Sequence, residues 1–348
     1  MRIFYQYSNV SPHELKPVKG DFINEINFVK TLNEFATVQY GGNPRPSDIY
    51  YIRANAKLFL KLPHPKIWFA SPFDRVCYKQ ADLITTFSEP WAEGIRNGNN
   101  FNWINPEDKN PYSKAVSISQ PVGEHFMPLK SHALTRKIRR EIGGNGKFVI
   151  GHFGKVTEVT YPSAFLKILP LLEKRGVIYF NASASRQKNF LPGRKWSFAY
   201  SQMPYAISAC DLIIISTQVA NGGWELSGCQ KILEAAACGI PLICGNSASR
   251  REFLGDHYPL LHSGFNKDET VGAKWDSDQF YKPESKKKDA EELLELINLV
   301  IENADLRIKI GQDLIVRANK RKPKQLANKL KPIFDGIKQK RTTGILLQ

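Results

Sequence analysis

Short apolar runs alternate along the chain with longer segments whose hydrophobic residues recur at helical spacing, which is the pattern of an α/β protein. The pattern predicts strands over Arg2–Tyr7, Ile49–Ile52, Lys66–Ala70, Leu83–Phe87, Phe148–Phe153, Val177–Asn181, Leu212–Ser216 and Pro241–Cys244. It predicts helices over Asp21–Phe35, Ser163–Arg175 and Lys231–Cys238. Strands that are apolar on both faces are typical of a buried parallel sheet, so we expect α/β units in both halves of the chain.

Two segments in different halves resemble each other. Ala81–Ser88 and Cys210–Ser216 each place an Asp before an apolar strand that ends in a hydroxyl residue. This predicts two similar units, each with a buried strand that ends at a polar cleft edge. The alternative is that apolar strands simply look alike. Asp82 and Asp211 are expected to serve structure at the strand starts.

A basic segment separates the two halves. Pro128–Lys147 carries six Lys or Arg residues against one acid, Glu141, and then a glycine-rich turn. This indicates a basic helix and a turn before a new strand, and we place the domain boundary there.

Charge and cysteine usage narrow the possible functions. The chain has 49 Lys and Arg against 33 Asp and Glu, a net charge of +16, which predicts attraction to nucleotides, nucleic acid or an acidic membrane. A hydrophobic content of 42% excludes wholesale disorder. No apolar run is long enough to span a bilayer. The N-terminus lacks a signal-peptide core, and the five cysteines show no Cys-x-x-Cys spacing, so we expect free thiols and a cytoplasmic protein.

The segment Asn221–Cys244 has the composition of a nucleotide site. Its helix would begin after a loop that lets the backbone approach a ligand, through Gly222, Gly223 and Gly228. The N–H groups at a helix start can hold a phosphate. Lys231 and Glu234 would share one helix face, where a carboxylate can accept two hydrogen bonds from a ribose diol. Gly239 is predicted to end the helix as a C-cap, with Pro241 opening the next strand.

The same segment resembles the donor-binding region of retaining glycosyltransferases of the GT-B fold, especially the family 4 group, also called glycosyl transferases group 1. That group has a Glu, a glycine-containing loop, a second Glu and then Ala-x-Ala-x-Gly-x-Pro. Ile150–Lys155 is similar to the strand and turn that open the donor domain, and Tyr205–Thr217 to the elements before the donor loop. Gln120–Pro128 is similar to the turn that closes the acceptor domain.

The resemblance implies two Rossmann-like domains whose parallel sheets face each other across a cleft. Residues 1–128 would form the acceptor domain and 129–324 the nucleotide-sugar donor domain. The C-terminal helix, about 325–348, would pack back on the first domain.

The resemblance also implies an activity. A sugar would pass from a UDP- or GDP-sugar co-substrate to an acceptor hydroxyl in glycan or polysaccharide synthesis, with retention and with neither a cofactor nor a metal. The absence of an Asp-x-Asp motif and of metal-ligand histidine spacing agrees with this. The implied catalytic residues are Asp74 and Glu225. The implied donor-binding residues are Gly154, Lys155, Ser227, Gly228, Cys229, Lys231 and Glu234.

The sequence departs from the family pattern at two places. Eight residues separate Glu225 from Glu234, where the family has seven. Lys155 stands at the family's Arg position, but Thr160 replaces the Lys that follows it. We hypothesise that Lys231 supplies the missing charge. Asp74 is a candidate base, with a turn or cap role as the alternative, and His13 is an equally weak candidate.

The acceptor and partners stay open at this stage. A glycan or lipid-linked acceptor is favoured, with Lys130–Arg140 or Arg317–Arg341 touching an anionic membrane. For Arg317–Arg341 the alternative is a solvated helix face. A DNA-modifying glucosyltransferase of the same fold and a catalytically inactive nucleotide-binding protein are the alternative functions. Nucleic acid is not favoured as a partner, because the basic clusters lack interleaved aromatics.

Overall fold

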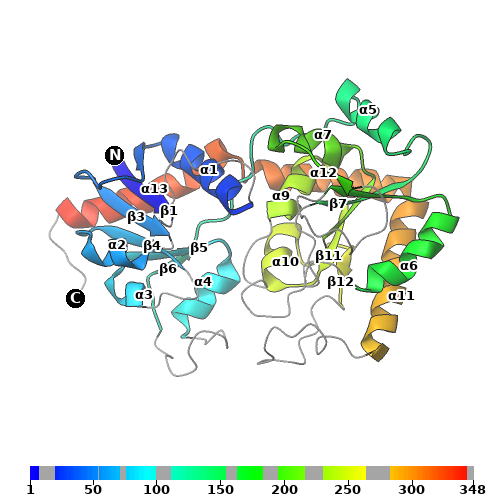
Figure 1. The fold of residues 1–348 in the computed structure, drawn as a ribbon. Coiled ribbons are helices and arrows are strands. Elements are labelled where there is room, and N and C mark those ends of the chain that lie inside the picture. The colour runs from blue at the N-terminus through cyan, green and yellow to red at the C-terminus, as the bar shows by residue number, and fades with distance from the viewer. Residues whose placement is uncertain are drawn as a thin grey trace. The chain divides into compact units, whose positions relative to one another are not determined.

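The computed structural model describes residues 1–7, 20–53, 55–70, 76–98, 111–153, 163–182, 195–215, 230–263 and 283–342. They divide into two compact units, each built on a six-stranded parallel sheet (Figure 1). The first unit contains the N-terminal sheet and also the last helix of the chain. The second unit contains the remaining elements.

The first sheet has the strand order β2-β1-β3-β4-β5-β6. Its strands are β1 (Arg2–Tyr7), β2 (Thr37–Tyr40), β3 (Ile49–Arg53), β4 (Lys66–Phe69), β5 (Leu83–Thr86) and β6 (Ala115–Ser117). Its helices are α1 (Gly20–Asn33), α2 (Ala56–Lys61), α3 (Val76–Gln80), α4 (Glu89–Arg96) and α13 (Pro323–Thr342). The chain steps from β1 to β2 in one direction and continues from β3 in the other, so β1 and β3 flank the topological switch point.

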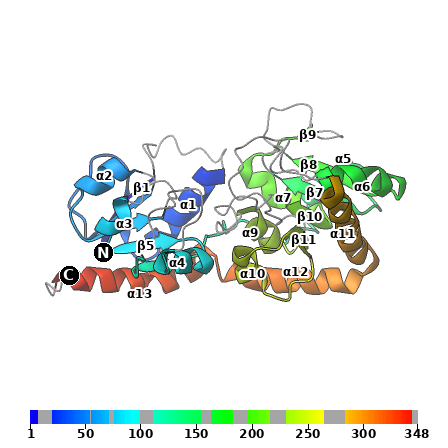
Figure 2. The same cartoon turned by 90° about the horizontal axis from the view of Figure 1, so that it is seen from below.

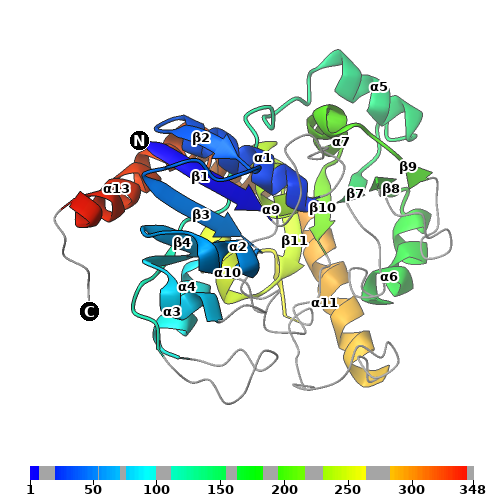
Figure 3. The ribbon, with the colours of Figure 1, turned by 60° about the vertical axis from the view of Figure 1, so that its left-hand side comes forward.

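Alternate residues of each strand pack into two separate cores. On β3, Tyr51 joins the core under α1 and α13, whereas Tyr50 and Ile52 join the core under α2, α3 and α4. Figure 3 shows β1, β3 and β4 side by side, and Figures 1 and 2 show α13 running along this unit. Phe334 of α13 packs edge-on against Tyr51, with ring centroids 6.0 Å apart. The last helix is therefore part of the first unit's core.

The second sheet has the strand order β12-β11-β10-β7-β8-β9. Its strands are β7 (Val149–Phe153), β8 (Ile178–Ala182), β9 (Lys195–Trp196), β10 (Leu212–Ile215), β11 (Leu242–Gly245) and β12 (Leu261–His262). Its helices are α5 (Ala133–Glu141), α6 (Ser163–Lys174), α7 (Met203–Ser208), α9 (Gln230–Ala237), α10 (Ala248–Leu254), α11 (Pro283–Glu302) and α12 (Ala304–Asn319).

The predicted strands and helices are confirmed, and so is the basic helix before β7, which is α5. The prediction missed four short strands, which are the edge strands of the two sheets: β2, β6, β9 and β12. Among the described helices, none has a stretch apolar and long enough to cross a membrane. Four cysteines fall in the described residues, and all are buried free thiols: Cys77, Cys210, Cys238 and Cys244.

Asp82 and Asp211 perform the same structural task in the two sheets. Asp82 Oδ2 accepts a hydrogen bond from the Lys66 amide at the start of β4, at 2.7 Å. Asp211 Oδ2 accepts one from the Val149 amide at the start of β7, at 2.9 Å. Each carboxylate therefore extends the ladder between two parallel strands beyond its last backbone bond. The predicted structural role of both residues is confirmed.

We predict that Asp211→Ala lowers the free energy of unfolding of the second unit by about 2 kcal/mol. Besides the Val149 amide, Asp211 Oδ2 accepts from Arg139 Nη2 at 2.7 Å, and both donors would lose this partner. Urea unfolding at a constant m-value measures the change. The matched control is Asp256→Ala, because the Asp256 side chain is 82% exposed. Equal unfolding free energies for the two variants would contradict the prediction.

Candidate functional site

The candidate site lies in the second unit, around α9 and the neighbouring strands β7 and β10. Helix α9 packs against α12, β10 and β11, and its Ile232, Leu233, Ala235 and Ala236 side chains are buried. Gly239 ends the helix with φ +71°, a left-handed conformation that favours glycine. Its N–H donates to the Ala236 carbonyl at 2.9 Å, and the Ile240 N–H donates to the Ala235 carbonyl at 3.1 Å. The predicted C-cap is confirmed.

A close helix contact fixes the position of α9. A Cβ atom at Gly311 of α12 would lie 2.4 Å from the Gly239 carbonyl oxygen. A Cβ at Gly239 would in turn meet the Ile315 side chain at 2.8 Å. Two glycines thus let the backbone of α12 approach the end of α9 more closely than other residues allow.

Glu234 is a buried carboxyl group on α9. Its exposed fraction is 6%, and the Tyr200 hydroxyl donates to Oε1 at 3.1 Å. Burial raises the pKa of Glu234 to about 7, while the Tyr200 hydrogen bond and the charge of Lys231 act in the opposite direction. A carboxyl group poised near neutrality inside a sheet–helix junction is a feature of functional sites more often than of plain cores.

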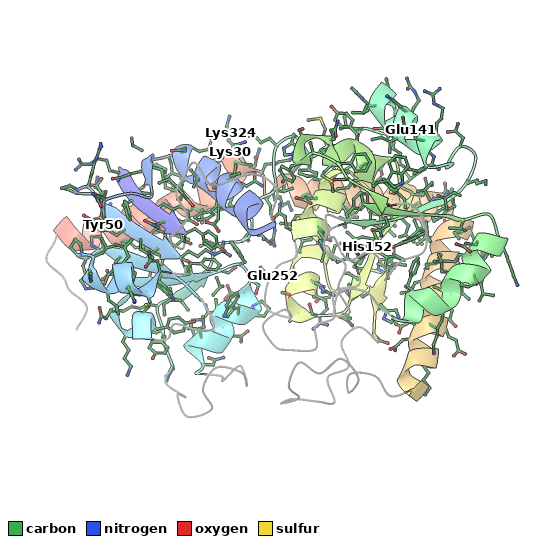
Figure 4. The ribbon with its side chains drawn as sticks, in the orientation of Figure 1. Lys30, Tyr50, Glu141, His152, Glu252 and Lys324 are labelled. Carbon is green, nitrogen blue, oxygen red and sulfur yellow. The ribbon has the colours of Figure 1, made fainter. Side chains whose placement is uncertain are left out.

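His152 lies near the carboxyl end of β7 and is labelled in Figure 4. It is 3% exposed, and Nδ1 lies 3.3 Å from the Ile214 carbonyl oxygen of β10. Because a carbonyl only accepts, Nδ1 carries the proton. Burial and the charge of Lys231 lower the pKa of His152 to about 3, so the ring is neutral at physiological pH. His152 therefore packs in the sheet and hydrogen-bonds to β10.

Lys231 links these two groups electrostatically. The ammonium charge lowers the pKa of both His152 and Glu234, so it lies within Coulombic range of each. Its side chain is partly exposed, whereas His152 and Glu234 are buried. The arrangement offers one cation, one hydrogen-bonding carboxyl group and one neutral imidazole.

Tyr200 is a site residue that sequence reasoning missed. Rings of His125 and Phe126 hold it, with centroid separations of 4.9 Å and 5.4 Å. Its hydroxyl then reaches Glu234, which lies 34 residues later in the chain. No local motif marks such a contact.

The described residues contain only part of the predicted site. Lys231 and Glu234 lie together on α9, as their spacing predicts. The other predicted site residues lie outside the described residues: Asp74, Gly154, Lys155, Glu225, Ser227, Gly228 and Cys229. His13 and Thr160 lie outside them as well. Within the part of the chain that the structure describes, no group of three His, Cys, Asp or Glu side chains is placed to hold a metal ion.

Comparison with known proteins identifies the fold. No family model matches the sequence, and no curated protein matches it. Among solved structures, HepE from Anabaena in complex with UDP has a TM-score of 0.64 and 14% identity, covering 96% of this chain and 99% of that chain. HepE has also been solved with UDP-glucose, with the same TM-score and identity.

Sucrose-phosphate synthase from Thermosynechococcus elongatus has a TM-score of 0.67 and 10% identity, covering 96% of this chain and 98% of that chain. A glycosyltransferase from Rickettsia africae has a TM-score of 0.59 and 13% identity, covering 97% of this chain and 98% of that chain. With two parallel α/β units and these neighbours, the chain has the GT-B fold that the sequence predicts.

Proposed function

We propose that this protein is a glycosyltransferase that moves a sugar from a nucleotide diphosphate sugar to an acceptor hydroxyl. The observation that carries the proposal is Glu234, a buried carboxyl group with a pKa of about 7 on the helix that the donor motif predicts. The similarity of nearly the whole chain to HepE, solved with UDP and with UDP-glucose, supports the same activity. UDP is therefore the nucleotide that we favour.

The chemistry assigned to the site follows from its charges. Ionised Glu234 would accept hydrogen bonds from the two ribose hydroxyls of the donor, while Tyr200 keeps the carboxylate oriented. The positive charge of Lys231 would stabilise the diphosphate as the bond from the sugar to phosphate breaks. The acceptor oxygen forms the new bond to the sugar carbon as the bond from that carbon to the diphosphate oxygen breaks, and its proton passes to the proposed base, Asp74. Retention of configuration and independence from metals are parts of the proposal.

The remaining assignments extend the same proposal. Asp74 and Glu225 are proposed as catalytic, and the donor would also contact Gly154, Lys155, Ser227, Gly228 and Cys229. A glycan or lipid-linked acceptor is proposed, with the basic helix α5 or the basic helix α13 contacting an anionic surface. Exposed cations on both helices support that contact: Arg136, Lys137, Arg140, Lys324, Lys329 and Lys331.

We expect UDP to raise the melting temperature of the protein more than GDP, CMP or ADP does. A ligand that binds only the folded state at 100 times its Kd stabilises that state by about 2.7 kcal/mol. Glu234→Ala should weaken UDP binding at least tenfold, about 1.4 kcal/mol, because the ribose hydroxyls lose their acceptor. Thermal unfolding against a series of nucleotide concentrations measures both effects.

The matched control is Glu252→Ala, which removes an exposed glutamate from the neighbouring helix α10 (Figure 4). This variant should retain the full stabilisation by UDP. If no nucleotide stabilises the native protein, the proposed function is wrong. If Glu234→Ala binds UDP as well as the native protein does, the assignment of Glu234 is wrong.

A further inference from the structure

A row of large side chains crosses the carboxyl end of the first sheet. Strand register pairs Tyr7 of β1 with Arg53 of β3, and Arg53 with Phe69 of β4. Because strand residues alternate between faces, Arg53 shares its face with Tyr51, which packs under α1 and α13. The row therefore lies on the α1 side of the sheet, at the switch point between β1 and β3. In open α/β sheets, ligands bind outside the carboxyl ends of the strands at this point.

The guanidinium of Arg53 is surrounded by aromatic rings. Its central carbon lies 5.0 Å from the ring centroid of Tyr7, 4.4 Å from that of Phe69 and 5.0 Å from that of Phe87. Such rings attract a cation and exclude water from it. In this setting a charged hydrogen bond is stronger than in bulk solvent.

Glu25 of α1 holds Arg53 from the other side. The Glu25 carboxyl group is fully buried, accepts from Arg53 Nη1 through Oε1, and accepts from the Tyr5 hydroxyl through Oε2. Burial disfavours the charge of Arg53, but the electrostatic effects of Glu25, Tyr5, Tyr7 and Tyr51 together outweigh it, and the pKa of the guanidinium is raised. Arg53 is thus a permanent cation in a fixed orientation.

Stability gained from the Arg53–Glu25 ion pair does not by itself account for this arrangement. Removing two charges from water costs about as much as their attraction returns, and apolar residues often replace such a pair without loss. Arg53 also keeps binding capacity. A guanidinium has five N–H donors, and within the described residues only Nη1 makes a hydrogen bond. The Arg53 side chain is 15% exposed, whereas Glu25 is completely covered, so the accessible part of the pair is the cation.

We propose that Arg53 binds an anionic substituent, a carboxylate or a phosphate, on the acceptor sugar. This inference rests on the proposed function and specifies its acceptor class. The planar fork of a guanidinium matches both anions, and bidentate contact gives it geometric specificity. Glu25 is a positioning residue that orients Arg53 through Nη1. The rings of Tyr7, Phe69 and Phe87 make the contact drier and therefore stronger.

Titration calorimetry with glucose, glucose 6-phosphate and glucuronate tests this inference. Saturating UDP keeps the phosphate probe away from the donor site. We expect at least one anionic probe to bind at least tenfold more tightly than glucose, and the probe that does so identifies the anion. Arg53→Lys should reduce this preference about tenfold, because lysine keeps the charge opposite Glu25 but loses the fork. Equal binding of all three probes, or an unchanged preference in Arg53→Lys, would overturn the inference.

A second variant, Glu25→Gln, is expected to raise the affinity for the anionic probe, whereas Arg53→Lys is expected to lower it. Glu25→Gln can keep its amide oxygen as the acceptor for Arg53 Nη1 while its amide N–H donates to the Tyr5 hydroxyl oxygen, and it removes the negative charge beside the bound anion. We expect it to bind the preferred probe several-fold more tightly, because the probe becomes the counter-charge of Arg53. A purely structural ion pair predicts no gain in affinity, and such a result would count against the inference.

Two controls separate this inference from the proposed function. Arg96→Lys changes another arginine of the first unit, paired with Glu89 and 32% exposed, and should leave probe binding unchanged. UDP binding should be the same in native protein and Arg53→Lys. If the native protein does not bind UDP, the proposed function is wrong. Normal UDP binding without an Arg53-dependent preference would refute the acceptor class alone.

Discussion

Replacement of Glu234 by Gln is expected to flatten the dependence of stability on pH between pH 5 and pH 8. The pKa of Glu234 is raised from 4.5 to about 7 by burial, so the folded state holds a proton that the unfolded state releases. Within this window the folded state binds more protons than the unfolded state. The free energy of unfolding therefore falls as pH rises from about 4.5 to about 7, and the full cost is present above pH 7.

The expected size follows from the shift. The raised pKa of Glu234 lowers the free energy of unfolding by about 3 kcal/mol at pH 8 and by less than about 1 kcal/mol at pH 5. Between these two values of pH, the native protein should lose about 2 to 3 kcal/mol more stability than Glu234→Gln. Any cost of burying the glutamine amide does not depend on pH, so it cancels from this difference. Urea unfolding at the two values of pH provides the measurement.

Glu295→Gln on α11 is the control, because removal of this exposed glutamate should leave the profile parallel to that of the native protein. Parallel profiles for Glu234→Gln as well would show that Glu234 titrates like an ordinary carboxyl group. The same variant should bind UDP more weakly than native protein at pH 8. If Glu234 is retained for binding at a cost in stability, its replacement should raise stability at high pH and lower nucleotide affinity.

Local patterns in the sequence predicted much of the framework of both units. Gly239 follows a run of alanines and precedes Ile240 and Pro241, and that order is enough to predict a helix, its C-cap and the next strand. Asp82 and Asp211 each stand directly before an apolar run, which predicted their role at strand starts. These features depend on residues that are neighbours in the chain. Edge strands such as β2 and β9 lack a strong apolar signal because they have one strand neighbour instead of two.

Contacts that depend on the tertiary fold left no such signal. Tyr200 reaches Glu234 over 34 residues, and Arg53 reaches Glu25 over 28. The sequence could not indicate that Glu234 would be buried, or that an aromatic row would surround Arg53. Sequence patterns therefore located helix α9, while the chemistry of both candidate sites required the three-dimensional structure.

The contact between α9 and α12 leads to the second large prediction. We expect Gly311→Ala to destabilise the second unit by about 3 kcal/mol, because overpacking a backbone contact forces the helix to move. The new Cβ would lie 2.4 Å from the Gly239 carbonyl oxygen, which is backbone and has no other rotamer to adopt. Native-state hydrogen exchange of the α12 amides measures the loss, since it reports the stability of this unit by itself.

Gly336 of α13 supplies a matched substitution with the opposite expected sign. Among the described residues, no atom beyond α13's own nearby backbone lies within 4 Å of a Cβ placed there, so Gly336→Ala should gain the helix propensity of alanine, up to about 1 kcal/mol. Exchange of the α13 amides would report that gain. Because Gly239 terminates the helix that carries Glu234, displacement of α12 in Gly311→Ala should also weaken UDP binding, whereas Gly336→Ala should not. Two variants of equal stability would show that α9 and α12 adjust without cost, and α9 would then not be held rigidly in place by α12.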